Sequence, residues 1–308
     1  MKFKLEDTKA KRIAFNRKSD RKYNWSSTIP WDIFGYEFDT LDMTSDFMSV
    51  TEVLQEAVGV EPDGLIGKQT LQAISEFFRR KHQYWNPYTG NIYSNSELSV
   101  DKIHYIKWNG LDIPIQMPES VGSLRHDLDL HPTGNFSAKD RVLDSIIVHW
   151  GGLDPEHLHR VFSNRDASSH FGIGLDSECR PYVAQFIDAA HVAWHAKGAN
   201  ETSLGIDICQ QPLLKWLGHY TNRGYDVRVI SNPAKGYGPE KILSLDPRIA
   251  KLTREFLRTL TFAFDIPHSY AKDHKLAKQP WSGILGHSNV DAKGQGKWDV
   301  APWWNDIQ

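Results

Sequence analysis

The residues of this chain best suited to chemistry lie in one stretch near its C-terminus. The sequence GHSNVDAKGQGKWDVAPWWN, residues 286–305, holds His287, Lys297 and Asp299 in a polar loop. Far upstream, His149 follows the apolar run SIIV. Imidazole nitrogen and carboxylate oxygen both bind zinc, and a catalytic zinc has three protein ligands and one open position. His149, His287 and Asp299 together would supply such a site.

Each of these histidines also has a structural interpretation when it is taken alone. The chain contains 14 histidines, so most of them must have ordinary roles. A histidine at the end of a buried strand is commonly a hydrogen-bonded core residue. His149 and His287 are also far apart in the sequence. Their spacing therefore does not decide whether His149 is a metal ligand or a core residue.

Buried strands and one long helix must position these residues. Short apolar runs predict strands in SIIVHWGG, SHFGIGLD, RPYVAQF and SLGIDIC, with a turn around Asp176–Ser177 joining the second and third. Residues 246–267 predict a helix with Asp246 at its N-cap and Pro247 in its first turn. Strands interleaved with a long helix indicate an α/β domain with a mixed central β-sheet flanked by helices. The apolar face of the helix is expected to hold Ile249, Leu252, Phe256, Leu260 and Phe264.

A small helical unit precedes this domain. In residues 49–78, apolar residues recur at helical spacing on both sides of the turn sequence EPDGLIG. Asp63–Gly64 and Gly67 are expected to supply positive φ angles in this turn. Thr70 is expected to cap the second helix.

The pattern divides the chain into four segments. The connector is expected to contain a hairpin in YIKWNGLDIPI that turns at Asn109–Gly110, and a loop in RHDLDLHPTGN. The four segments are an N-terminal extension without sustained periodicity at 1–45, the small helical domain at 46–84, the connector at 85–135 and the α/β domain at 136–308.

Composition indicates a globular protein without a dominant charge. The formal net charge is −2, so no overall field recruits nucleic acid or an anionic membrane. Basic residues gather in residues 9–22, where a solvated arm is preferred to a docking patch for an anionic polymer. The two cysteines, Cys179 and Cys209, are too few for a disulfide framework and indicate buried thiols in a reducing compartment.

The chain shows no sign of a targeting or membrane-spanning segment. The first residues, MKFKLEDTKAKR, lack the apolar run of a secretory signal. No stretch approaches the roughly 20 apolar residues that span a bilayer. We therefore expect synthesis in the cytoplasm and no membrane insertion.

Three blocks of the chain resemble the zinc-dependent N-acetylmuramoyl-L-alanine amidases of type 2, relatives of peptidoglycan recognition proteins and of phage amidase-type lysozymes. The blocks are IIVHWGG, the stretch from SSHFGIGLD to SLGIDI, and GILGHSNVDAKGQGKWDVAP. They occur in the order of that family and cover residues 140–305. The resemblance implies the type-2 amidase fold and Zn²⁺ as cofactor.

The resemblance also implies roles for individual residues. His149 and His287 correspond to two zinc ligands, and Asp299 stands where the family has aspartate or cysteine as the third. Lys297 corresponds to the lysine that stabilises the oxyanion of the tetrahedral intermediate, and a preorganised charge there lowers the barrier.

The general base and the substrate cleft are assigned on the same resemblance. Some relatives have a tyrosine where this chain has Ser169, so a tyrosine role does not carry over. Others use a glutamate that aligns with Asp207, and the Asp207 carboxylate would then activate water as the general base. The alternative is that Asp207 only orients a metal ligand or ends a strand. His195 matches a histidine of the cleft and is expected to support binding or the transition state, with core packing as the alternative. Packing roles are expected for His170, His191 and Trp194.

The small helical unit resembles the three-helix peptidoglycan-binding domain. The signature of that domain is a D-G-x-x-G-x-x-T turn, which Asp63, Gly64, Gly67 and Thr70 match in register. No helix is recognisable before residue 46, so we expect a shortened copy. A weak binder tethered to a catalytic domain raises the local enzyme concentration on a polymer.

The expected function is a monomeric, modular peptidoglycan hydrolase with no nucleic-acid partner. It would cut the amide bond between N-acetylmuramic acid and L-alanine, as an endolysin that reaches the wall after release from the cytoplasm. A bacterial recycling amidase would share this chemistry. The alternatives of another class are a non-catalytic recognition protein and a wall-associated component of a virion.

Overall fold

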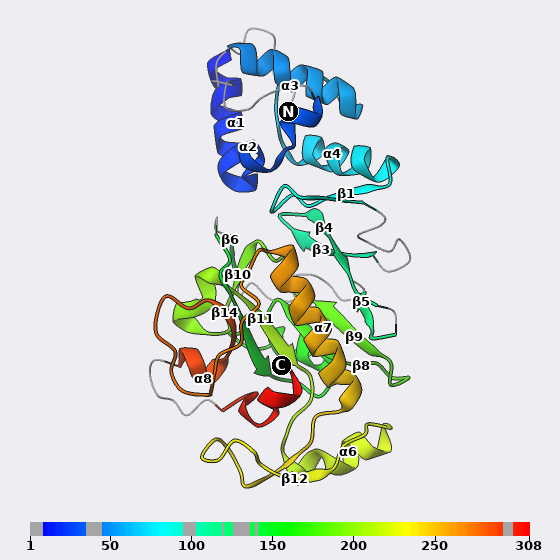
Figure 1. Cartoon of the computed structure of the whole chain (residues 1–308), viewed down its shortest axis with the longest axis vertical. Coiled ribbons are helices and arrows are strands. Elements are labelled where there is room, and N and C mark those ends of the chain that lie inside the picture. The colour runs from blue at the N-terminus through cyan, green and yellow to red at the C-terminus, as the bar shows by residue number, and fades with distance from the viewer. Residues whose placement is uncertain are drawn as a thin grey trace. The chain divides into compact units, whose positions relative to one another are not determined.

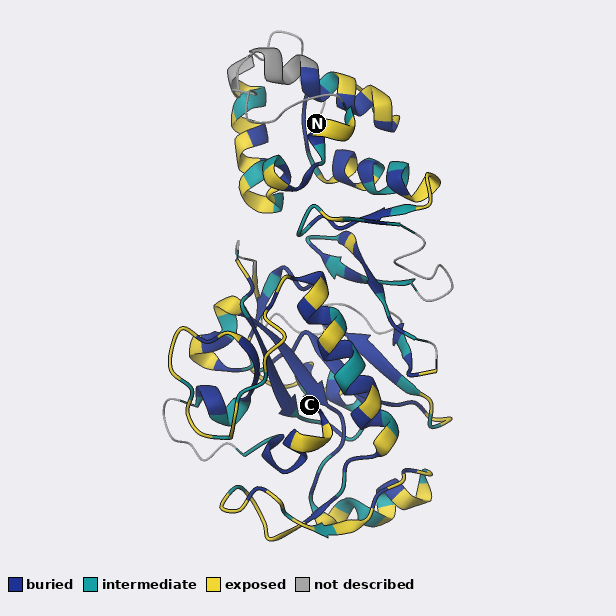
Figure 2. Ribbon diagram, viewed as in Figure 1, coloured by how far each residue is buried: buried dark blue, intermediate teal, exposed yellow. Residues whose placement is uncertain are grey.

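The chain forms two compact units, Met1–Pro114 and Ile115–Gln308, in a computed structural model (Figure 1). In the first unit the helices have both buried and exposed faces, whereas the central strands of the second unit are buried almost throughout (Figure 2). The structure describes residues 9–34, 45–94, 103–118, 120–125, 136–138, 141–291 and 298–308.

The first unit is helical, with two small hairpins at its C-terminal end. Its apolar core joins Leu54, Ile74 and Phe78 from two of the helices to Trp25 and Trp85. The elements are α1 (Lys9–Tyr23), α2 (Trp25–Thr28), the 3₁₀ helix η1 (Trp31–Phe34), α3 (Ser45–Val58), α4 (Lys68–Arg80), β1 (Gln83–Trp85), β2 (Ile92–Ser94), β3 (Ile103–Trp108) and β4 (Leu111–Gln116).

Helix α1 shows that the expectation of no helix before residue 46 is wrong. The sequence of α1 is polar, so periodicity did not reveal it. A polar clamp holds it instead, because the fully buried Asn16 donates to the carbonyl of Gly64 at 2.9 Å and accepts from the amide of Ile66 at 2.9 Å. The signature turn is therefore stabilised from a helix that lies about fifty positions earlier.

The turn between α3 and α4 differs in detail from its prediction. Gly64 has the expected positive φ of 69°, but Gly67 has a φ of −128° and is itself the N-cap of α4. Thr70 lies inside the helix, where its hydroxyl donates to the carbonyl of Leu65 at 3.1 Å, so the prediction that it caps α4 is wrong. The Asp63 carboxylate accepts from the Leu65 amide at 2.9 Å and closes the turn.

The expected connector, residues 85–135, contains paired strands. Strands β1 and β2 form one hairpin, and β3 and β4 form another that turns at Asn109–Gly110 as predicted, with φ angles of 51° and 70°. The loop predicted in RHDLDLHPTGN falls mostly on residues 126–135, which lie outside the described residues.

The second unit is built on a mixed six-stranded sheet, as predicted. The strand order is β14-β7-β11-β8-β9-β5. Neighbouring strands are parallel except β8 and β9, which are antiparallel and flank the predicted turn. The strands are β5 (Ser123–Arg125), β7 (Ser145–Trp150), β8 (Phe171–Leu175), β9 (Pro181–Gln185), β11 (Ser203–Ile208) and β14 (Gly283–Gly286), and β6 (Phe136–Ala138) pairs with β10 (His191–Ala193) and β12 (Val229–Ser231) with β13 (Lys241–Leu243).

Helices cover both faces of this sheet. Along β8, Phe171 packs its ring 5.1 Å from that of Phe256 in α7. Gly174 points to the other face, since alternate residues of a strand do so, and lies against Pro155 of α5. The predicted apolar face of α7 is buried. The helices are α5 (Pro155–Phe162), α6 (Leu217–Asn222), α7 (Pro247–Ala263) and α8 (His287–Val290), with the 3₁₀ helices η4 (Lys197–Thr202), η5 (Leu214–Trp216) and η6 (Ala301–Asp306).

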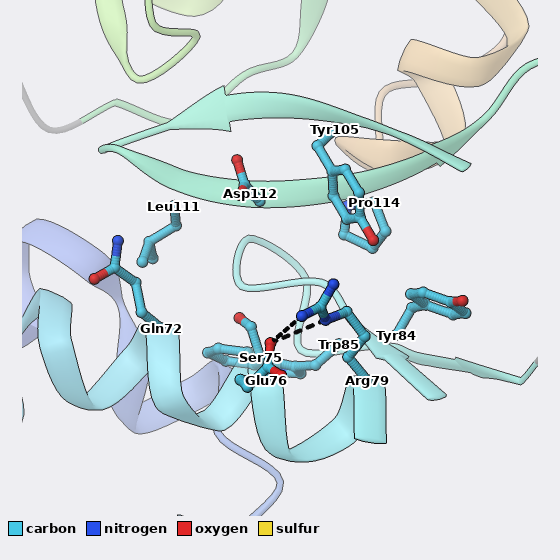
Figure 3. A pocket seen from close by; sticks show the side chains of 10 residues that line it. All are labelled: Gln72, Ser75, Glu76, Arg79, Tyr84, Trp85, Tyr105, Leu111, Asp112 and Pro114. Atoms are coloured by element: carbon cyan, nitrogen blue, oxygen red, sulfur yellow. Dashed lines mark hydrogen bonds and ion pairs between the residues drawn. The ribbon is translucent and has the colours of Figure 1, made fainter. Parts of the chain in front are cut away.

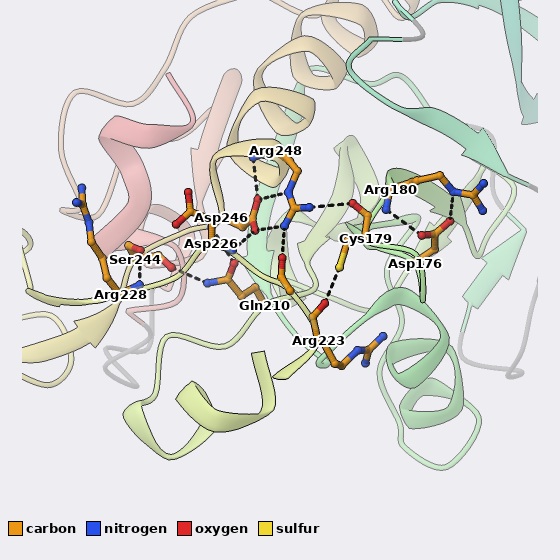
Figure 4. A network of polar contacts seen from close by, with 11 residues as sticks. Asp176, Cys179, Arg180, Gln210, Arg223, Asp226, Arg228, Ser244, Asp246 and Arg248 are labelled. Atoms are coloured by element: carbon orange, nitrogen blue, oxygen red, sulfur yellow. Dashed lines mark hydrogen bonds and ion pairs between the residues drawn. The ribbon is translucent and has the colours of Figure 1, made fainter. Parts of the chain in front are cut away.

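A polar network anchors the start of α7. The buried Asp246 carboxylate caps the helix by accepting from the Arg248 amide at 2.9 Å, and it also accepts from the Asp226 amide at 2.8 Å. The Arg248 guanidinium reaches the same carboxylate at 2.7 Å and the carbonyl of Cys179 at 3.1 Å (Figure 4). Asp246 is thus the predicted N-cap, and Arg248 ties α7 to the turn after β8.

The same turn is organised by Asp176, and we expect this residue to make stability pH-dependent. Burial alone would raise the pKa of Asp176, but hydrogen bonds from the Arg180 backbone and the Arg125 side chain outweigh it and lower the pKa from 3.8 to about 2. A carboxyl group whose pKa is lower in the folded than in the unfolded state stabilises the fold at pH values above its unfolded pKa. This stabilisation is lost as the pH falls towards the folded pKa. The contribution is at most about 2.5 kcal/mol, since one unit of pKa shift corresponds to about 1.4 kcal/mol.

Urea unfolding of the wild type and of Asp176→Asn measures this contribution. The difference in unfolding free energy between the two proteins should be largest at pH 5 and should shrink between about pH 4 and pH 2. A difference that stays constant over this range would show that Asp176 does not contribute through its charge.

Neither of the two cysteines forms a disulfide. Cys209 is buried as expected, whereas Cys179 is half-buried in the turn after β8. Among the described residues, no helix combines the length and the apolar character needed to cross a bilayer.

Candidate functional site

Three parallel strands bring the predicted site residues to one edge of the sheet. In β7, His149 lies opposite Asp207 of the neighbouring β11. On the other side of β7, Val148 pairs with Gly286, the last residue of β14, so His287 follows beside His149. The carboxyl ends of parallel strands meet at the same edge, which is where α/β folds place their ligands.

The three predicted metal ligands converge at this edge. His149 Nδ1 lies 3.0 Å from His287 Nδ1 and 3.2 Å from Asp299 Oδ2. His287 Nδ1 lies 2.7 Å from the same carboxylate oxygen. Among the described residues these three form a cluster whose ligand atoms all lie within 4.8 Å of one another. The structure therefore brings together three residues whose spacing in the sequence did not show that they form one site.

The chemistry of this donor set fits a divalent metal. Two imidazole nitrogens 3.0 Å apart cannot both direct lone pairs at each other unless a proton or a cation lies between them. Burial alone would raise the pKa of Asp299, but hydrogen bonds with His149 and His287 hold it well below its usual value. Two imidazoles and an ionised carboxylate are the open, three-ligand set of a catalytic zinc site.

His195 lies against His149, on the side away from the cluster. Its Nδ1 is 3.1 Å from His149 Nε2, and its Nε2 is 3.3 Å from the hydroxyl of Ser203. With Nδ1 of His149 turned to the cluster, Nε2 carries the hydrogen and donates to His195. Burial and the neighbouring His149 hold the pKa of His195 well below its usual value, so this ring is neutral.

A glycine makes this stacking possible. A Cβ at Gly205 would lie 2.7 Å from Cγ of His195, so only glycine lets the ring rest on β11. The Ser203 hydroxyl donates in turn to the carbonyl of Ala199. The role of Ser203 was not predicted, and the only signal in the sequence was its place at the start of the apolar run SLGIDIC, shortly after His195.

Asp207 is buried at the same sheet edge. Its carboxylate hydrogen-bonds with the hydroxyl of Ser169, the residue at the position of the tyrosine in some relatives. Burial raises the pKa of Asp207, and His149 partly offsets this effect. A Cβ at Gly151 would lie 2.6 Å from Asp207 Oδ1, so the glycine after β7 leaves room for the carboxylate.

A cavity of about 540 Å³ adjoins the cluster. His195, His287 and Asp291 contribute to its lining, together with Trp194 and Trp281. Trp194 has 43% of its surface exposed, so the expectation that it serves mainly in packing is wrong. The volume lies in the range of small-molecule sites, and the tryptophans supply the apolar surface that such sites share.

The remaining predicted residues are placed as follows. His170 is fully buried and accepts from the Gly205 amide at 2.9 Å, and His191 stacks on Phe136 with ring centroids 4.9 Å apart. Lys297 falls in residues 292–297, which lie outside the described residues. In the first unit, Asp63, Gly64, Gly67 and Thr70 lie in or beside the turn before α4.

The chain belongs to the Amidase_2 family of N-acetylmuramoyl-L-alanine amidases, whose sequence profile matches residues 138–302. The family activity is hydrolysis of the amide between N-acetylmuramic acid and L-alanine in peptidoglycan, and the matched region contains the whole ligand cluster. No curated protein matches the chain.

Part of the chain is similar to solved structures of proteins named XlyA, PlyG and PlyL. The catalytic domain of XlyA is 17% identical, and the match covers 60% of this chain and 99% of that chain with a TM-score of 0.34. The PlyG catalytic domain is 16% identical, with 59% and 86% covered and a TM-score of 0.34. PlyL is 14% identical, with 60% and 89% covered and a TM-score of 0.35.

Proposed function

We propose that the chain is a zinc-dependent peptidoglycan amidase that releases stem peptides from the glycan strand. The observation that carries this proposal is the convergence of His149, His287 and Asp299 at the edge of the sheet, inside the region that matches the family. The three ligand positions are all occupied by metal-binding residue types, which favours an enzyme over a recognition protein that only binds wall fragments.

The residues of the chain divide the work of hydrolysis. His149, His287 and Asp299 would hold Zn²⁺, which when bound polarises the scissile carbonyl and stabilises the negative charge that develops on it. Asp207 takes a proton from the attacking water and passes it to the departing amino group of L-alanine. Its raised pKa makes it a stronger base than an ordinary aspartate. On the family resemblance, Lys297 supplies a second positive charge to the oxyanion.

His195 acts through His149 rather than on the substrate. The neutral ring accepts the hydrogen of His149 Nε2 and leaves Nδ1 free to bind the metal. Ser203 and Gly205 keep His195 in this orientation. His195 is therefore a positioning residue in this proposal.

The proposed biological role is lysis of a bacterial host cell from within, as an endolysin. Its support is the resemblance to phage amidase-type lysozymes and the presence of a helical unit before the amidase. A recycling amidase would instead prefer small soluble fragments. Purified protein added to cells stripped of their outer membrane should clear them, and a marked preference for soluble fragments over these cells would contradict the lytic role.

A digest of purified peptidoglycan tests the bond and the metal together. Mass spectrometry should find released stem peptides with free L-alanine amino termini. A chelator should abolish release, and added zinc should restore it. New reducing sugar ends, or a cut within the peptide, would contradict the proposed bond, and full activity in the chelator would contradict the metal.

A further inference from the structure

The first unit contains a groove that the amidase site does not use. It has a volume of about 330 Å³ and lies between helix α4 and the β3–β4 hairpin (Figure 3). All of its lining residues belong to the Met1–Pro114 unit. The signature residues Asp63 and Thr70 are not among them. The groove is therefore separate from the turn on which the resemblance to a peptidoglycan-binding domain rests.

The walls of the groove are held in place by the core of the unit. Leu111, the first residue of β4, is 2% exposed and packs with Ile74 and Phe78 of α4 and with Trp85 of β1. The Asn109–Gly110 turn directly before Leu111 brings the hairpin back across the helix. A wall fixed in this way is preorganised, so ordering it costs little of the binding free energy.

One side of the groove is aromatic. Tyr84 of β1 and Tyr105 of β3 stand near each other, with Pro114 beside Tyr105 (Figure 3). Burial raises the pKa of Tyr105, so its hydroxyl stays protonated at neutral pH. Tyrosines offer an apolar ring face together with a polar tip. A pyranose ring has the matching surface, since its C–H groups form an apolar face and its hydroxyls lie around the edge.

The groove also carries polar groups, and their charges are paired with nearby side chains. Glu76 forms an ion pair with Arg79 at 2.7 Å, and Asp112 forms one with Lys107. Gln72, exposed on α4, adds a carboxamide that both donates and accepts hydrogen bonds. Paired charges do not attract a strongly charged ligand, so these walls disfavour nucleic acid and phosphate. They suit a neutral ligand with many hydroxyl and amide groups.

We propose that this groove binds the glycan strand of peptidoglycan through an N-acetylhexosamine unit. The sugar ring stacks on Tyr105 and Tyr84, and its hydroxyl and acetamido groups bond to Gln72 and Asp112. This inference rests on the proposed function insofar as the bound polymer is the amidase's own substrate. Binding at a second, tethered site raises the concentration of the catalytic unit along the wall without any new contact at the amidase site.

Titration of the full chain with the tetramer of N-acetylglucosamine tests the groove. We expect the wild type to bind the tetramer, and Tyr105→Ala to bind at least about tenfold more weakly, a change of about 1.4 kcal/mol. Gln72→Ala should weaken binding several-fold, and it is expected to fold normally because alanine is the best helix former at an exposed helical position. Isothermal titration calorimetry measures the affinities, and thermal unfolding confirms that each variant is folded.

Tyr88→Ala is the matched control, since Tyr88 is another half-buried tyrosine of the same unit that does not line the groove. It should keep wild-type affinity for the tetramer. The proposal is overturned by a wild type that does not bind the tetramer, by unchanged affinity in both groove variants, or by an equal loss in Tyr88→Ala. Binding of a free stem peptide in place of the tetramer, lost in Tyr105→Ala, would likewise overturn the glycan as ligand.

A second assay separates this proposal from the proposed function. A soluble muramoyl-peptide fragment is small enough to occupy the amidase site alone, and its cleavage by the wild type is followed by mass spectrometry. Cleavage without tetramer binding would contradict glycan binding in the groove and support the amidase activity. Tetramer binding without cleavage would support glycan binding and contradict the amidase activity.

Discussion

His149→Ala is expected to abolish peptidoglycan hydrolysis, with a loss of more than about a thousandfold, because electrostatic stabilisation of the transition state is usually the largest catalytic contribution. His149 lies between the other members of the site, 3.0 Å from His287 and 3.2 Å from Asp299 through one nitrogen and 3.1 Å from His195 through the other. Its removal would leave two of the three proposed ligands, too few to retain zinc against competing water. Release of stem peptides and bound zinc by elemental analysis are the two measurements.

His159→Ala is the matched control for this variant. His159 is a half-buried histidine of α5 in the same unit, with its ring 6.0 Å from that of Phe186 and no part in the cluster. It should retain both zinc and activity. His149→Ala protein that is folded by circular dichroism and still hydrolyses peptidoglycan at the wild-type rate would remove the cluster from the mechanism.

Asp207→Asn is expected to lower kcat by about 10²- to 10⁴-fold, the usual contribution of general acid–base catalysis. The amide keeps the shape of the carboxylate and can still accept from Ser169, but it cannot take a proton. Zinc content should stay at the wild-type level, because Asp207 is not a member of the ligand cluster. Steady-state hydrolysis of a soluble muramoyl-peptide and elemental analysis of the purified variant measure the two properties.

The zinc content of Asp207→Asn decides between the two roles open to this residue. Loss of zinc in parallel with activity would show that Asp207 orients a ligand and is not the base. Asp188→Asn provides the control, because Asp188 is also buried and its oxygen accepts from the Ala190 amide at 3.0 Å, a bond that asparagine can keep. That variant should retain both zinc and turnover.

Local pattern was sufficient for the elements that frame the site. The buried strand before His149, the helix capped by Asp246 and the hairpin at Asn109–Gly110 are found where their sequences predicted them. Each depends on interactions between residues close in sequence, such as a cap, a turn or an apolar face. The order of the family blocks then predicted the fold of the second unit and the three residues that meet at its edge.

Contacts between distant segments determined the rest. Helix α1 is held by the bonds of Asn16 to the turn before α4, and nothing in its own polar sequence predicts them. The contact of His195 with His149 depends on Ser203 and Gly205 of β11, which hold the His195 ring in place. The exposure of Trp194 is likewise a property of the folded chain. The groove of the first unit forms because Leu111 packs in the core with residues of α4 and so holds the β3–β4 hairpin beside that helix. Sequence alone does not reveal these features, because each depends on side chains that meet only when the chain is folded.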